Sequence, residues 1–254
     1  NIISGGASSE DLLAIAIQPD GKIIAAGRTA SGDAADMIVA RYETDGSLDS
    51  SFASNGLFIH AFSPLNDQIN AVVVQPDGKI LVAGSATAGM DPTDTSNFAV
   101  VRLGTDGEID ETFGDNGIVT ISVGSGQSLA LALVLQPDSK YLVAGFSGYP
   151  TLATIVRCLP DGSLDNSFGT DGVVTTLIGA EAALELGLTL QPDGKILGVA
   201  DSYDSFGSAH DFAVVRYNSN GDLDSSFGSG GVVLTAIADQ SIIPTSLALQ
   251  PDNK

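Results

Sequence analysis

The chain has 254 residues, of which 43% are hydrophobic, and a formal net charge of −21. The hydrophobic content excludes intrinsic disorder, and the shortage of lysine and arginine excludes a nucleic-acid-binding protein, because phosphate backbones are bound through clustered basic side chains. The apolar runs are too short for membrane insertion, and the acid excess either keeps an apolar-rich chain soluble or attracts cations and basic partners.

One pattern of about 58 residues occurs four times along the chain and begins a fifth time. The sequence Gln-Pro-Asp-Gly-Lys begins at Gln18, Gln75 and Gln191, and variants of it begin at Gln136 and Gln250. Proline followed by Asp-Gly suits a tight turn between two strands, which we name A and B. The A strands are predicted at 12–17, 71–74, 129–135, 186–190 and 247–249, and the B strands at 23–26, 80–83, 141–144 and 196–200.

A third apolar run in each copy ends at an arginine and predicts a strand C. A stretch of the type Asp-Gly-Ser-Leu-Asp-Ser-Ser-Phe follows, and a glycine after it opens a fourth run, strand D. The C strands are predicted at 37–41, 98–102, 154–157 and 212–216, and the D strands at 57–61, 118–122, 173–177 and 232–236.

Four strands per repeat predict an all-β protein, a β-propeller of four-stranded antiparallel blades. A β-solenoid is the alternative, although tight hairpins favour antiparallel neighbours. We expect a single propeller domain, or a fragment of one, with repeats at roughly 12–61, 70–122, 129–177 and 185–236 and partial strands at 1–4 and 246–254. The half-blades at the two ends predict a natural chain that continues beyond Lys254 into a ring of at least five blades, or self-association through the unpaired strands.

The repeated motifs resemble those of the bacterial delta-60 repeat family. The resemblance rests on QPDGKI with its following apolar run, on FAVVRY at Phe212, and on DGSLD-x-SFG followed by a glycine and valine, and it covers essentially the whole chain. It implies a propeller fold and a secreted or cell-surface bacterial protein. It implies no catalytic residues.

In such a blade the A–B and C–D turns share one end of the sheet, and the B–C loops lie at the other. The B–C loops, predicted at 28–36, 85–97, 146–151 and 201–211, vary between repeats and are the predicted binding face. Plain solvated loops are the alternative, and the absence of tryptophan disfavours stacking on sugars. The binding-face candidates are Asp33, Asp36, Asp91, Asp94, Tyr149, Asp201, Tyr203, Asp204, Phe206 and His210.

The arginine that closes each C strand is expected to pair with an aspartate of a C–D turn in the same or the next blade, because a guanidinium forks onto a carboxylate. We expect these pairs to be structural, with ligand binding as the alternative. The pairs are Arg41 with Asp49, Arg102 with Asp110, Arg157 with Asp165, and Arg216 with Asp224.

No cofactor is predicted, and Ca²⁺ at the paired carboxylates of the C–D turns is the alternative, although their spacing is not that of an EF-hand loop. Of the two histidines, His60 and His210, the latter is the better candidate for catalysis, and the lone Cys158 is expected to be a buried apolar residue. The predicted function is a non-catalytic binding or scaffold module for a protein or glycan partner. A propeller hydrolase or lyase with an acidic central pocket is the alternative.

Overall fold

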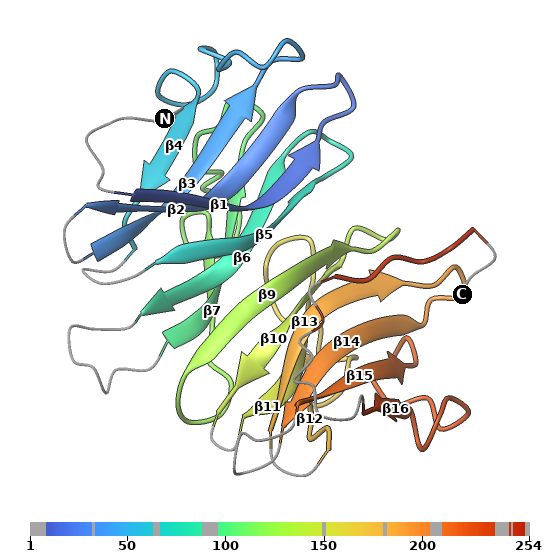
Figure 1. Cartoon of the computed structure of the whole chain (residues 1–254). Helices are drawn as coiled ribbons and strands as arrows, with labels where there is room; N and C mark the ends of the chain where they lie inside the picture. Colours follow the sequence, from blue (N-terminus) through green and yellow to red (C-terminus); the bar gives the residue numbers. More distant parts are fainter. Residues whose placement is uncertain are drawn as a thin grey trace. The chain divides into compact units, whose positions relative to one another are not determined.

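The computed structural model describes residues 9–31, 34–62, 67–87, 96–148, 151–179, 182–203, 210–236, 244 and 246–251. These residues form strands β1 to β16, arranged in four separate four-stranded sheets in which every recorded pairing is antiparallel (Figure 1). The described residues contain no helix, so none of them provides a helix with the length and hydropathy of a membrane crossing. The predicted order of strands A to D is confirmed in each repeat, and we call the sheets blades 1 to 4.

The blades follow one another along the chain, and the strands of each are consecutive. Blade 1 holds β1 (Ser9–Ile17), β2 (Ile23–Ser31), β3 (Ala34–Tyr42) and β4 (Leu57–His60). Blade 2 holds β5 (Gln68–Val74), β6 (Ile80–Thr87), β7 (Ser96–Leu103) and β8 (Ile118–Ile121). Blade 3 holds β9 (Ser128–Leu135), β10 (Tyr141–Ser147), β11 (Leu152–Cys158) and β12 (Val173–Thr176). Blade 4 holds β13 (Ala182–Leu190), β14 (Ile196–Tyr203), β15 (His210–Tyr217) and β16 (Val232–Thr235).

The A–B turn is formed by local hydrogen bonds that its sequence favours. In blade 1 the Gln18 N–H donates to the Lys22 carbonyl at 2.8 Å, and the Gly21 N–H donates to the Gln18 carbonyl at 2.9 Å. Gly21 has a φ of 87°, a left-handed conformation that glycine adopts without steric cost. Blade 3 places Ser139 there at a φ of 67°, so its turn keeps the geometry despite the changed residue.

The C–D turn folds back onto the end of strand C. In blade 1 the Asp49 N–H donates to the Arg41 carbonyl and the Phe52 N–H donates to the Asp49 carbonyl, at 2.9 and 3.0 Å. The same two bonds recur in the other three blades. This geometry brings the C–D turn beside the A–B turn, where the Lys22 ammonium lies 2.7 Å from an Asp49 carboxylate oxygen. The prediction that both turns occupy one end of the sheet is therefore confirmed within each blade.

The B–C hairpins differ from the prediction, because their strands extend further than the apolar runs. In blade 1 the antiparallel register continues through Thr29 opposite Asp36, and in blade 4 it continues through Tyr203 opposite His210. Backbone pairing is independent of side-chain polarity, so polar strand ends remain in the sheet. Asp36, Asp201, Tyr203 and His210 consequently lie in strands, which corrects their predicted placement in loops.

The two ends of the chain carry no described strand. Residues 1–4 lie outside the described residues, and residues 246–251 are described but form no strand. Leu247 lies close to Gly187 of β13, so this segment remains against blade 4 without joining its sheet. A β-strand is stable only when its backbone is hydrogen-bonded to a neighbouring strand, and the apolar pattern of these residues does not reveal whether such a neighbour exists.

The chain divides into two compact units. Unit 1 comprises residues 1–122 and 126–130 and contains blades 1 and 2, whereas unit 2 comprises residues 123–125 and 131–254 and contains most of blade 3 and all of blade 4. Each unit has its own apolar core between two blades. In unit 1 the core includes Ile24, Val39, Phe52, Ile80 and Val101. In unit 2 it includes Leu142, Ile155, Phe168, Ile196 and Val215.

A glycine of the second blade covers a phenylalanine of the first in both units. A Cβ atom on Gly107 would lie 2.6 Å from the Phe52 ring, and a Cβ atom on Gly221 would lie 3.0 Å from the Phe168 ring. Both glycines have a positive φ, of 87° and 96°. The Asp-Gly or Asn-Gly pair of the C–D turn therefore serves both the turn and the packing of one blade on the next.

Candidate functional site

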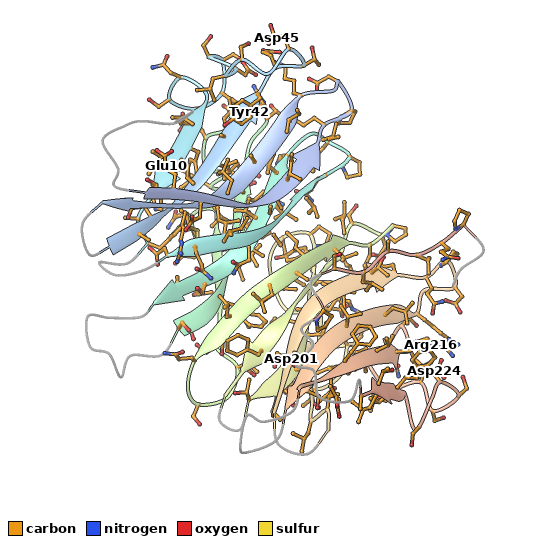
Figure 2. The ribbon with its side chains drawn as sticks, in the orientation of Figure 1. Glu10, Tyr42, Asp45, Asp201, Arg216 and Asp224 are labelled. Carbon is orange, nitrogen blue, oxygen red and sulfur yellow. The ribbon has the colours of Figure 1, made fainter. Side chains whose placement is uncertain are left out.

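Each C–D turn contains an arginine–aspartate ion pair. The Arg41 Nε atom donates to the Asp49 carboxylate at 2.6 Å, and the corresponding distances in blades 2, 3 and 4 are 2.7, 2.7 and 2.8 Å. The structure thus brings together every arginine and aspartate that the sequence analysis paired, always within one blade. Figure 2 labels Arg216 and Asp224, which lie together at the turn end of blade 4.

The lysine of the A–B turn contacts the same aspartate, which the sequence analysis did not anticipate. The distances from the lysine Nζ atom to the aspartate are 2.7, 2.8, 2.9 and 3.0 Å in blades 1 to 4. The sequence contains a signal for this contact, because the lysine and the aspartate recur in every repeat and the two turns are predicted at the same end of the blade. We call the arginine, the aspartate, the lysine and the phenylalanine described next the corner cluster of a blade.

The arginine of each corner cluster also lies over an aromatic ring. Its guanidinium carbon is 4.5 Å from the ring centroid of the phenylalanine that ends the C–D motif, in all four blades. In unit 1 the Arg41 Nη1 atom donates to the Thr105 carbonyl of blade 2 at 2.6 Å, and in unit 2 Arg157 donates to the Ser219 carbonyl of blade 4 at 2.6 Å. These arginines therefore fix the turn and link it to the following blade.

The corner clusters hold the aspartates in their charged form. Hydrogen bonds from Lys22 and Ser51 hold the pKa of Asp49 well below its ordinary value. Burial alone would raise the pKa of Asp110, but hydrogen bonds from Lys79 and Thr112 outweigh it and lower that pKa as well. The pKa values of Asp165 and Asp224 are lowered by the corresponding contacts. The repeated charges are thus satisfied within the fold.

The structure describes four of the ten predicted binding-face residues, which are Asp36, Asp201, Tyr203 and His210. Asp36 is partly buried in β3. Asp201, which Figure 2 labels, lies in β14 and is 2% exposed. Tyr203 and His210 end β14 and β15 opposite each other, although their side chains are outside the description. Six of the predicted residues lie outside the described residues: Asp33, Asp91, Asp94, Tyr149, Asp204 and Phe206.

The carboxylates proposed as calcium ligands have other partners. Asp45 accepts hydrogen bonds from the Ser47 N–H and hydroxyl at 2.9 and 2.7 Å, and Asp49 belongs to the corner cluster of blade 1. The described residues contain no group of three or more His, Cys, Asp or Glu side chains arranged to hold a metal ion. Cys158 is buried, and burial raises the pKa of its thiol to about 12, so it is a poor nucleophile.

A groove of about 390 Å³ lies in unit 1 between the C–D turn and β4 of blade 1 and the C–D turn of blade 2. Its apolar lining includes Leu57, Phe58 and Ile59 of β4 and Ile109 of blade 2. Ile59 is 48% exposed, whereas Phe58 is 7% exposed and anchors the groove in the core of unit 1. We call this feature the blade 1–2 groove.

The polar lining of the blade 1–2 groove consists mainly of His60, Glu108 and Glu111. The His60 ring stacks on Phe58 with centroids 5.8 Å apart and planes 7° apart, and its centroid lies 4.3 Å from that of Phe62. Both glutamates are exposed, and none of the described residues that line the groove is lysine or arginine. The described lining therefore combines aromatic surface and carboxylates without a lysine or arginine to neutralise them.

Several lining residues depart from the repeat, and Phe58, His60 and Glu111 are the departures that set the aromatic and acidic character of the groove. Phe58 occupies a position that is valine in the other three blades, and His60 occupies one that is Ile121, Thr176 or Thr235. Glu111 replaces Ser50, Asn166 and Ser225. These departures come from two different blades and meet in one groove. Sequence reasoning missed them because it searched the loops of variable length, whereas comparing each repeat position in turn would have shown them.

The family comparison identifies the repeat. The model of a family described as "Domain of unknown function (DUF5122) beta-propeller" matches residues 18–52, 75–113, 136–168 and 191–227, which is more than half of the chain. Each matched segment runs from the A–B turn to the phenylalanine of the corner cluster. No curated protein shows significant similarity to the chain.

Three solved structures resemble the chain at low sequence identity. A crystal structure of a protein of unknown function from Dyadobacter fermentans has a TM-score of 0.56 and 12% identity, with 94% of this chain and 67% of that chain covered. An exo-1,5-alpha-L-arabinanase from a bovine ruminal metagenomic library has a TM-score of 0.42 and 14% identity, covering 92% and 81% of the two chains. A Bombyx mori GH32 beta-fructofuranosidase has a TM-score of 0.44 and 11% identity, covering 91% and 51%. The first likeness concerns the fold alone, and the other two are too weak for any argument.

Proposed function

The chain belongs to the DUF5122 β-propeller family, and from that premise we propose that it is a non-catalytic binding module whose contact surface includes the blade 1–2 groove. One observation carries the proposal. The repeated charged residues are engaged in corner clusters, whereas three residues that break the repeat converge on an open groove. Repeated positions preserve the frame of a repeat protein, and binding specificity arises where the repeats differ.

The chemistry of the blade 1–2 groove favours binding over catalysis. A general acid or base is expected in a water-excluding pocket with a shifted pKa. The glutamates of this groove are exposed, and His60 lies on β4, the last strand at one edge of the sheet. A partly apolar, partly charged surface groove suits a segment of a protein partner.

The proposed setting is a secreted or cell-surface bacterial protein of the delta-60 type. The resemblance of the QPDGK and DGSLD motifs supports this assignment. Terminal sequencing and intact-mass measurement of the protein from its source test it directly. A mature N-terminus produced by signal-peptide cleavage is the expected result, and an uncleaved cytoplasmic product would contradict it.

A double substitution provides the test of the proposed binding surface. In the variant His60→Thr/Glu111→Ser, each new residue is the one that blade 3 or blade 4 carries at the equivalent position, so the fold is expected to persist. The wild-type chain and this variant are applied to the same peptide and glycan arrays. We expect ligands that bind the wild-type chain to lose at least about tenfold in affinity for the variant, which corresponds to about 1.4 kcal/mol.

The matched control for that experiment is Asp115→Ser, which removes one negative charge from the same turn of blade 2 without altering a residue that lines the groove. This control should bind as the wild-type chain does. Equal binding by the double variant and the wild-type chain would refute the role of the groove. Turnover of a chromogenic glycoside by the wild-type chain would favour the hydrolase alternative instead.

A further inference from the structure

The corner clusters supply an internal example of how this chain binds a guanidinium group. In each of them the guanidinium carbon lies 4.5 Å from the centroid of a phenylalanine ring. The arginine Nε atom also donates a hydrogen bond to a carboxylate, with a nitrogen–oxygen distance of 2.6 to 2.8 Å. An aromatic face attracts the delocalised cation, and a carboxylate accepts its planar array of N–H groups. The two components together form a guanidinium site.

The blade 1–2 groove contains a comparable pair of components, with an imidazole in place of the phenyl ring. His60 supplies a partly exposed aromatic ring that packs against Phe58 and Phe62, and Glu108 and Glu111 supply carboxylates from the facing turn. In a corner cluster the cation comes from the chain itself, but the described lining of the groove has no lysine or arginine. The net charge of −21 favours the approach of a positively charged group from outside.

We propose that the blade 1–2 groove binds an arginine side chain of a partner polypeptide. The guanidinium group lies between the two glutamate carboxylates and the His60 ring, and apolar neighbours of that arginine contact Leu57, Ile59 and Ile109. The inference rests on the proposed function, because it names the chemical class of partner for the same groove. A lysine is a weaker ligand, because its compact ammonium cannot pair with two carboxylates in a plane.

The combination of an aromatic ring and two carboxylates is specific to unit 1, because unit 2 carries different residues at the corresponding positions. Thr176 stands at the position of His60, is 7% exposed, and accepts a hydrogen bond from the Tyr217 hydroxyl at 3.1 Å. Ser225 stands at the position of Glu111, which leaves Asp222 as the one carboxylate equivalent to the glutamate pair. An arginine peptide should therefore contact the two units unequally.

The test is a titration of the intact ¹⁵N-labelled chain with the peptide acetyl-Leu-Arg-Leu-amide, followed by backbone amide resonances. We expect saturable shifts at residues 57–60 and 108–111, with a dissociation constant on the order of 1 mM for so short a ligand. The resonances of residues 173–176 and 222–225 should shift much less. Raising the salt concentration should weaken the binding, because exposed charges are screened.

Two matched peptides isolate the guanidinium charge. Citrulline in place of arginine keeps the size and most N–H donors but is neutral, and we expect at least tenfold weaker binding. Lysine in place of arginine should bind about threefold to tenfold more weakly. The variant Glu108→Gln/Glu111→Gln should lose at least tenfold for the arginine peptide, while Asp115→Ser should bind normally, with the unit 2 resonances reporting that each variant is folded.

Equal binding of the citrulline and arginine peptides would overturn the inference, as would the absence of shifts in the groove. The array experiment distinguishes a failure of the arginine-site inference from a failure of the proposed binding function. If groove-dependent ligands are found that contain no basic group, the groove is a binding site but not an arginine site. If neither arrays nor titration reveal a groove-dependent ligand, both proposals are wrong.

Discussion

The blade 1–2 groove and the corresponding region between blades 3 and 4 are built on equivalent repeat positions, yet their side chains differ. Both have a corner cluster and an arginine that donates to the next blade, through Arg41 in unit 1 and Arg157 in unit 2. In unit 2 the Tyr217 hydroxyl donates to Thr176, and both side chains are buried. In unit 1 the residues at these positions are Leu103 and His60, and His60 remains partly exposed in the groove.

This difference separates the positions that maintain the fold from those that we propose for binding. Substitutions at shared positions should affect both units similarly, because the same contacts recur in both. Substitutions of Phe58, His60 or Glu111 should instead alter only unit 1. Substitutions and conditions that act on both units, or on one unit alone, test that distinction.

Acid should affect both units together, because it acts on all four corner clusters. The pKa values of Asp49, Asp110, Asp165 and Asp224 are lowered in the folded state, chiefly through hydrogen bonds from the corner lysine and the following Ser or Thr. A lowered folded-state pKa contributes stability that is complete above the unfolded-state value and lost as the pH falls toward the folded-state value. Thermal unfolding followed by circular dichroism should show a steep fall in midpoint below about pH 4. A midpoint that stays constant from pH 6 to pH 2 would contradict this account.

Adding a methyl group to Gly107 should test the packing of blade 2 on blade 1. Gly107→Ala should lower the free energy of unfolding by about 3 kcal/mol, because alanine is strained in the left-handed backbone conformation and its methyl group clashes with the Phe52 ring. Gly46→Ala is the control, since Gly46 has nearly the same φ, of 86°, but no atom within 4 Å of the added methyl group. It should lose only about 1 kcal/mol. Equal losses in urea unfolding would remove the packing role assigned to the glycine.

Removing the guanidinium groups should have matching effects in the two units. Arg41→Met and Arg157→Met each lose an ion pair, a contact with a phenylalanine ring and a hydrogen bond to the following blade. We expect each to lower the free energy of unfolding by about 2 kcal/mol, because the lysine still neutralises the aspartate. A large effect in only one unit would show that the two corner clusters are not equivalent.

The smallest expected effect is a stabilisation. Ala53 has a φ of 42° at the position where the other blades carry Gly114, Gly169 and Gly228, each with a φ of 53°. Ala53→Gly should relieve backbone strain and raise the free energy of unfolding by about 0.5 kcal/mol, after the greater entropy of the unfolded glycine is counted. The reciprocal change Gly169→Ala should be destabilising, because its Cβ atom would clash with the Val173 carbonyl oxygen. If urea unfolding showed that Ala53→Gly destabilises the chain and Gly169→Ala stabilises it, backbone strain at this position would be disproved.

The fold was largely predictable from the sequence because its signals are local and repeated. Pro-Asp-Gly sets each A–B turn, and the arginine and aspartate of each copy are eight residues apart across the C–D turn. Strand ends were less predictable, since the residue pair Thr29 and Asp36 is polar and is kept in the sheet by backbone pairing. The groove could not be located from spacing, because His60 and Glu111 come from different blades and meet only through packing.

We propose that positions where the repeats differ bind ligand, whereas the shared positions maintain the fold. The most direct measurement compares His60→Thr/Glu111→Ser with the wild-type chain in both urea unfolding and titration with acetyl-Leu-Arg-Leu-amide. We expect a change of less than about 1 kcal/mol in the free energy of unfolding and at least about a tenfold loss of peptide affinity. Unchanged affinity in a folded variant would contradict this proposal.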